Sequence, residues 1–229
     1  MRKIEALNTR TPIPIMKFTL TYDGELRASG NKPKPEDKWA IRRQIAPQLA
    51  ELWQVSPVLK NLEKQAFVPA DDRRYTPQEM YHTIMPTTSV IPMDHMNLCH
   101  SLMVDGVYFM PLVRTSLSLV CDLDILFLRK GEPGALIQRG GDIDNRIKTL
   151  LDGLRMPKAD EMAFCTDRQT LPNLVYCLLE DDALTTDFSV KSGQLLTRLG
   201  GSDADVRLVI GVTVKVVHVR SYNMALIGD

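Results

Sequence analysis

The feature that most constrains the fold is a long β-rich run, S-L-S-L-V-C-D-L-D-I-L-F-L, which ends at Leu128. Branched and aromatic side chains of this kind favour strands. A shorter run precedes it, and together Tyr108–Val113 and Leu117–Leu128 predict a β-hairpin. Further strands are predicted at Met16–Tyr22, Leu174–Leu179 and Val206–Val219, with Asp187–Lys191 as a candidate continuation of the sheet.

Two segments have the 3.6-residue period of helices instead. In Glu36–Trp53 the residues Trp39, Ile45 and Leu49 can share one face, although Pro47 interrupts the pattern, and Asp142–Arg155 has a cleaner apolar stripe. Strands and helices in this order predict an α+β fold, a mixed β-sheet with helices packed on one face. We expect a single domain over residues 1–229. Two irregular stretches look like insertions, at about 56–103, with one or two short helices, and at about 156–172.

Composition narrows the class of protein. The chain is 44% hydrophobic and 24% charged, which is ordinary for a globular protein with a real core. Its N-terminus has no continuous apolar stretch and no run of about 18 apolar residues occurs, so neither a secretory signal nor a membrane span is expected. The four cysteines have no C-x-x-C or zinc spacing and predict buried free thiols in a reducing, cytoplasmic setting.

The segment G-G-D-I-D-N-R-I-K-T-L-L-D-G-L, residues 140–154, carries the first candidate chemistry. Asp142 can cap the helix, while Asp144, Lys148 and Asp152 stand one turn apart on another face. Taken alone, these residues predict a helix cap and surface ion pairs, each contributing only about 0.3–0.5 kcal/mol.

A second acidic cluster changes that interpretation. Glu180, Asp181 and Asp182 directly follow the apolar strand and repel one another, with nothing basic beside them in sequence. A hard divalent cation such as Mg²⁺ would relieve this repulsion through carboxylate oxygens. Carboxylates from a helix start and a strand end can hold such an ion, and Lys148, one turn into the helix, would then stabilise charge on a phosphate.

The strings D-I-D-N-R-I-K-T-L-L-D-G-L and L-E-D-D-A resemble the RusA family of Holliday junction resolvases. The resemblance implies that Asp142, Asp144 and Asp182 are metal ligands and that Lys148 is functional. It implies a RusA-like homodimer that cleaves branched or four-way DNA with Mg²⁺, or with Mn²⁺ instead, by symmetric nicking. The family has alanine at the position of Gly153. The chain departs from the family in a longer gap between the two acidic clusters, in a reduced basic run before the first, and in the Ser56–Met103 region, which has no counterpart there.

Further residues complete this hypothesis. Asp181, Asn145 and Asp152 would support the metal ligands. The residues assigned to DNA backbone contacts are Lys32, Lys34, Lys38, Arg42, Arg43 and Arg146. For the basic segment an ordinary solvated helix face is an equally good interpretation, and the zero net charge gives no support for binding through bulk charge.

Two other groups of residues have weaker indications of metal binding. Asp94, His95, Cys99 and His100 fit no established metal spacing. Asp122 and Asp124 form a second D-x-D within the longest run, which a partly solvated face at a sheet edge would explain, with an accessory role near the metal as the alternative.

Two other functions remain open. One is a nucleic-acid-binding module of the same fold that cuts nothing. The other is a metal-dependent phosphodiesterase that acts on another substrate.

Overall fold

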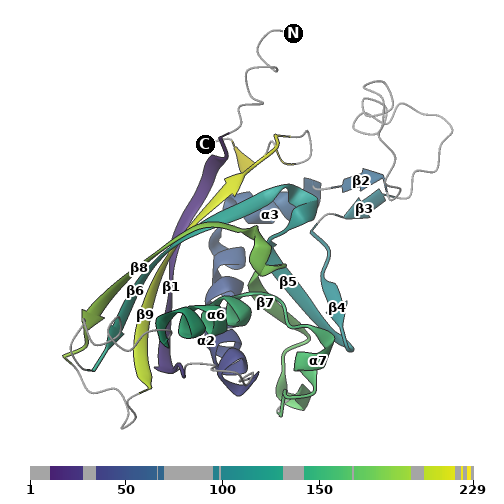
Figure 1. Cartoon of the computed structure of the whole chain (residues 1–229). Coiled ribbons are helices and arrows are strands. Elements are labelled where there is room, and N and C mark those ends of the chain that lie inside the picture. The colour runs from purple at the N-terminus through teal and green to yellow at the C-terminus, as the bar shows by residue number, and fades with distance from the viewer. Residues whose placement is uncertain are drawn as a thin grey trace, which may run out of the picture.

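The computed structural model of the chain (Figure 1) describes residues 11–27, 35–65, 67–69, 95–97, 99–130, 142–166, 168–196, 204–219, 223 and 226–227. Within these residues the fold is α+β, as predicted. No helix in these ranges is long and apolar enough to cross a membrane. The four cysteines are free and buried, which confirms that prediction.

The larger sheet contains the long strands predicted from the sequence. Its order is β1 (Ile13–Glu25), β9 (Asp205–Val216), β6 (Leu119–Arg129) and β8 (Thr185–Gln194). β9 pairs antiparallel with both β1 and β6, whereas β6 and β8 are parallel. The C-terminal strand therefore lies in the middle of the sheet, between the first strand and β6.

A second sheet has three strands, β4 (Leu102–Val104), β5 (Val107–Val113) and β7 (Leu174–Leu179) in that order. The single mixed sheet predicted from the sequence is thus two mixed sheets. The predicted hairpin between β5 and β6 is also wrong, because each strand pairs within a different sheet. β5 forms its hairpin with β4 across Asp105 and Gly106, which have φ of 48° and 79°, as expected of the Asp-Gly turns that join tight hairpins.

The two sheets are joined at a corner, where the chain passes twice from a strand of the smaller sheet to a strand of the larger sheet. β5 leads into β6 through residues 114–118, and β7 leads into β8 through residues 180–184, five residues each. Each connection contains a short 3₁₀ turn, η1 (Thr115–Leu117) and η3 (Asp182–Leu184). Since β5 is parallel to β7 and β6 is parallel to β8, one parallel pair leaves the smaller sheet and enters the larger one.

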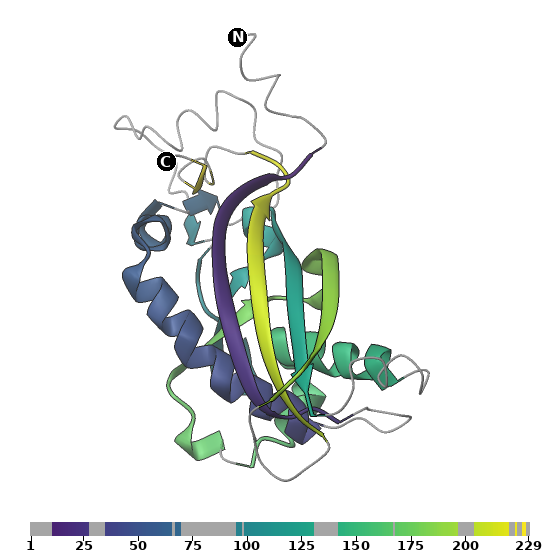
Figure 2. The same ribbon diagram turned by 90° about the vertical axis from the view of Figure 1, so that its left-hand side faces the viewer.

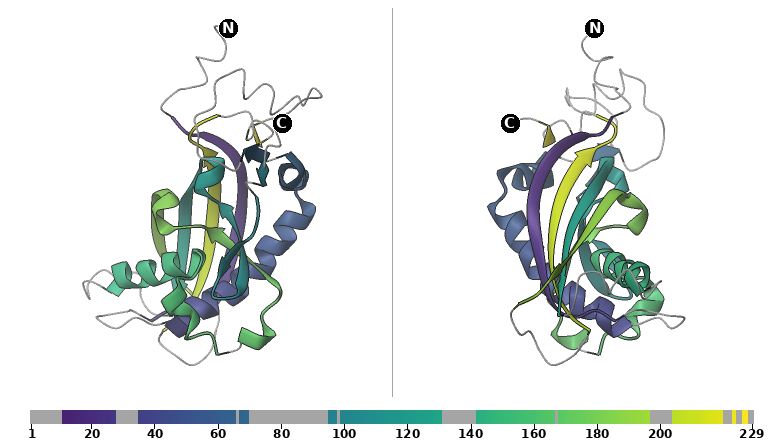
Figure 3. Two further views of the ribbon diagram at one scale, coloured as in Figure 1. Left: turned by 90° about the vertical axis from the view of Figure 1, so that its right-hand side faces the viewer. Right: turned by 60° about the vertical axis from the view of Figure 1, so that its left-hand side comes forward.

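Helices cover one side of the larger sheet (Figure 2). α2 (Pro35–Val55) packs against β1, β7 and α6 (Asp142–Leu154), which confirms both predicted helices. The two irregular stretches contain α3 (Pro57–Gln65), the ribbon of β2 (Phe67–Pro69) and β3 (His95–Asn97), and α7 (Ala159–Met162) with η2 (Arg168–Thr170). Figure 3 shows the helices from both sides of the molecule.

The core lies between these helices and the larger sheet. In β9 every second residue from Val206 to Val216 is buried, while the residues between them are only half-buried. β6 has the same alternation, from Leu119 to Phe127. No described helix covers the opposite face of the larger sheet (Figure 2), so that face is open to solvent in the described structure.

Candidate functional site

The helix α6 presents the predicted apolar stripe to the core and two charged residues to solvent. Ile147, Leu150 and Leu154 are buried. Asp144 and Lys148, one turn apart, are both exposed. The alternative interpretation paired them with each other, but among the described residues neither makes an ion pair. No described side chain therefore competes with a ligand for either charge through an ion pair.

In the acidic cluster after β7, two carboxylates have structural roles and the third is exposed. The Glu180 carboxylate accepts a hydrogen bond from the backbone N–H of Thr115 at 2.8 Å, and its own N–H donates to the Val113 carbonyl at 2.9 Å, so it joins the two corner connections. Asp181 caps η3 by accepting from the N–H of Ala183 at 3.0 Å. That hydrogen bond lowers the pKa of Asp181. Asp182 is exposed and lies in the turn itself.

The corner turn lies against α6. The N–H of Met156, just after the helix, donates to the Leu179 carbonyl at 2.9 Å, and Arg155 and Leu179 form a parallel bridge. η3 packs against the same helix. The structure thus brings the turn that carries Asp182 alongside the helix that carries Asp144 and Lys148, although the two acidic clusters are far apart in sequence.

The ligand chemistry at this place suits a hard cation, because carboxylate oxygens at exposed positions are what Mg²⁺ prefers. α6 begins at Asp142, whose side chain lies outside the described structure. In the part of the chain that is described, no three His, Cys, Asp or Glu side chains form a group that could hold a metal. Asp144, Asp181 and Asp182 are all among these residues and do not form such a group by themselves.

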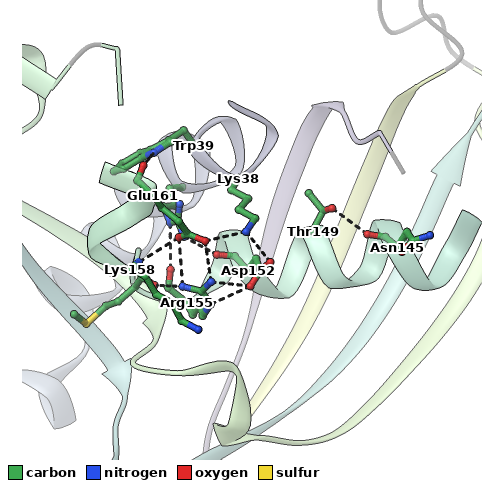
Figure 4. A network of polar contacts seen from close by, with 10 residues as sticks. Lys38, Trp39, Asn145, Thr149, Asp152, Arg155, Lys158 and Glu161 are labelled. Atoms are coloured by element: carbon green, nitrogen blue, oxygen red, sulfur yellow. Dashed lines mark hydrogen bonds and ion pairs between the residues drawn. The ribbon is translucent and has the colours of Figure 1, made fainter. Parts of the chain in front are cut away.

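Asp152, predicted to support the metal, belongs instead to a buried charge network (Figure 4). The network joins α2, α6 and α7 around the carboxylate of Glu161. Glu161 accepts from Lys38 Nζ at 2.8 Å, Arg42 Nη2 at 2.8 Å and Arg155 Nη2 at 2.9 Å. Asp152 accepts from Lys38 and Arg155, each at 2.8 Å.

Burial and charge act in opposite directions on Glu161. Burial by itself would raise the pKa of this carboxyl, but Arg42, Lys38 and Arg155 outweigh it and hold the pKa at about 2. The Arg42 guanidinium also lies 5.1 Å from the centre of the Trp39 ring, a cation–π contact. Burial lowers the pKa of Arg42, whereas the Glu161 carboxylate raises it. The carboxylate and the Trp39 ring stabilise the charged guanidinium in the core.

This network corrects the predicted DNA contacts. Arg42 is buried, and Lys38 is 12% exposed in its side chain, so both are committed to Glu161 rather than available to a phosphate. Arg146 is also buried and donates to the Leu26 carbonyl. Arg43 is exposed. Lys32 and Lys34 lie outside the described residues.

The sequence carried a signal for the network. Arg42 is three residues from both Trp39 and Ile45, so it occupies a core position in the apolar pattern of α2. A charge at such a position requires a buried partner. That partner, Glu161, is in the stretch predicted to be an irregular insertion.

The second D-x-D lies on the open face of the larger sheet, in a hollow of about 500 Å³. The face is solvated as predicted, but β6 is an inner strand rather than an edge. Asp122 forms an ion pair with Lys215, and Asp124 accepts from Ser189 Oγ at 2.5 Å. These bonds explain both acids without a metal.

Asn145 lies beside Asp144 on α6, half-buried, and its backbone carbonyl accepts from Thr149 Oγ1 at 3.0 Å (Figure 4).

Comparison of the chain with protein families, with curated proteins and with solved structures finds no match. The resemblance to the RusA family therefore rests on the two motifs alone.

Proposed function

We propose that this protein is a Mg²⁺-dependent endonuclease that cuts branched DNA such as four-way junctions. The observation that carries the proposal is the packing of the turn with Asp182 against the helix with Asp144 and Lys148. All three side chains are exposed. Exposed carboxylates and a lysine on two elements that pack together offer the oxygen ligands that a hard cation takes and a positive charge for a phosphate.

In this proposal Asp142, Asp144 and Asp182 hold the cation. A bound divalent cation supplies an activated water and neutralises charge on the reacting phosphate. Lys148 donates to a non-bridging phosphate oxygen, where its charge is worth most as negative charge develops. Asp181 fixes the turn that presents Asp182.

The first prediction tests this chemistry directly. A labelled synthetic four-way junction is incubated with the protein and Mg²⁺, and strand nicks are measured. We expect paired nicks that disappear with a chelator and fall at least a hundredfold in Asp144→Asn, because loss of even an outer partner of a metal ligand costs roughly 10–100-fold. Asp160→Asn, an exposed carboxylate on α7, is the matched control and should cut normally.

Metal binding is measured separately by thermal melting. Mg²⁺ or Mn²⁺ should raise the melting temperature of the parent and of Asp160→Asn, but not of Asp144→Asn. Nicks that persist with chelator, or in Asp144→Asn, would overturn the proposal. Junction binding without nicks would favour the binding module, and hydrolysis of simple phosphodiesters but not junctions would favour the phosphodiesterase.

A further inference from the structure

In the described part of the chain, β8 forms one long edge of the larger sheet. Within the described ranges it pairs only with β6, and most of its ten residues are exposed. Figures 1 and 3 show it on the outside of the sheet. An exposed edge of this length presents a row of backbone donors and acceptors that readily accept another strand. Phe188, 52% exposed, adds an apolar side chain to this edge.

The sequence of β8 is complementary to itself about Ser189. Asp187 and Lys191 lie two residues to either side of it, and Phe188 and Val190 lie one residue to either side. If two copies of the strand pair antiparallel with Ser189 on the two-fold axis, each residue lies opposite its mirror position. Asp187 of one copy then faces Lys191 of the other, and Phe188 faces Val190.

This register would place complementary side chains opposite each other on both faces of the sheet. Asp187 and Ser189 pair in register with Asp122 and Asp124 of β6 and lie on the open face. Asp187 has no hydrogen-bond or ion-pair partner among the residues described, so a second Lys191 would supply one. Opposite charges directly across an antiparallel pair stabilise it.

On the other face the pairing would cover apolar surface. Phe188 and Val190 are in register with the core residues Leu123 and Ile125 of β6. Phe188 is nevertheless half exposed, because no strand lies beyond it in the described structure. Val190 of a second copy would lie directly against it.

We infer that a second copy of this chain binds along β8, antiparallel and centred on Ser189, and joins two four-stranded sheets into one. A two-fold axis makes such an interface self-complementary, which the sequence of β8 already is. The resemblance to the RusA family implies a homodimer, and the geometry of β8 assigns the surface. The inference does not depend on nuclease activity.

Charge reversal tests the register. Sedimentation equilibrium of the full chain gives the dimer dissociation constant for the parent, Asp187→Lys, Lys191→Asp and the double variant. Each single change places like charges opposite each other twice per dimer, so we expect the dissociation constant to rise about tenfold. Lys191→Asp also removes the ion pair between Lys191 and Asp124 of the same chain, so Asp187→Lys is the cleaner of the two tests. The double variant restores opposite charges and should recover most of the affinity.

Two exposed residues away from β8 serve as charge-matched controls, Glu51→Lys on α2 and Lys60→Asp on α3, and both should leave the dissociation constant unchanged. Hydrogen exchange of the β8 amides provides a second readout, with protection that increases with protein concentration. A monomer at all concentrations would overturn the inference. So would a dimer that is insensitive to Asp187→Lys, or edge amides protected independently of concentration, which would show that another part of the chain covers β8.

Discussion

The single carboxylate of Glu161 forms ion pairs with side chains from three helical regions. It lies on α7, while Lys38 and Arg42 come from α2 and Arg155 directly follows α6. The side chains of Arg42 and Arg155 are at most 5% exposed. A buried charge network of this kind adds little compared with an apolar core, but it becomes costly when one partner is lost.

The second prediction follows from this arrangement. Glu161→Gln removes one negative charge and leaves Asp152 as the only carboxylate of the network for three cations, so we expect the free energy of unfolding to fall by about 3–5 kcal/mol. Denaturant titration measures it. Glu51→Gln, which changes an exposed carboxylate, should change stability by less than about 0.5 kcal/mol. Equal effects of the two substitutions would contradict the role of the network.

The third prediction concerns pH. The pKa of Glu161 is about 2 in the folded protein against 4.5 for an ordinary glutamate, so the unfolded chain binds the proton more readily. The stability that this charge supplies is present above about pH 4.5 and is lost as the pH falls toward 2. Unfolding titrations in this range should therefore show a flatter pH dependence for Glu161→Gln than for the parent.

At the scale of elements, α2 and α6 cross so closely that a glycine is required. A Cβ built on Gly153 would lie 2.8 Å from both Cβ and Cδ1 of Ile41. Real Cβ atoms do not approach neighbours that closely. The close approach explains why position 153 is a glycine in this chain.

The fourth prediction is that Gly153→Ala destabilises the protein. In an exposed helix the same change stabilises by about 1 kcal/mol, but overpacking at this crossing should lower the free energy of unfolding by about 1–3 kcal/mol. Denaturant titration again measures it. Combining the change with Ile41→Ala, which removes the clashing Cδ1 and Cγ2 atoms but keeps Cβ, should cost less than the sum of the two single changes. Simple additivity would show that the crossing tolerates a methyl group.

The helices and the long strands of the larger sheet could be predicted from the sequence because their signal is local. The apolar period of α6 and the alternation in β9 are properties of neighbouring residues. The pairing of β5 and β6 was predicted wrongly for the opposite reason: nothing within those runs indicates that β7 and β9 are their partners. At the candidate site, periodicity predicts the exposed positions of Asp144 and Lys148, but the contact between η3 and α6 depends on the corner, which no local pattern shows.

At the scale of the whole molecule, one sheet face holds the core and the other is uncovered by the described elements. The fifth prediction compares two valines of β9 that differ only in the face they occupy. Val212→Thr buries a hydroxyl among core residues and should cost about 1–3 kcal/mol. Val209→Thr, on the open face, should change stability by less than about 0.5 kcal/mol. Thermal or chemical unfolding measures both, and an equal loss in Val209→Thr would show that something covers this face.

The corner between the sheets has a consequence for how the chain tolerates changes in length. Residues 114–118 and 180–184 each connect a strand of the smaller sheet to a strand of the larger sheet. A hydrogen bond between the Thr115 N–H and the Glu180 carboxylate joins the two connections. Inserting one residue into either segment alone would shift one strand by a single position against its parallel neighbour, and a shift of one turns every following side chain to the opposite face. The two segments must therefore lengthen or shorten together, so a viable insertion in one should require a matching insertion in the other.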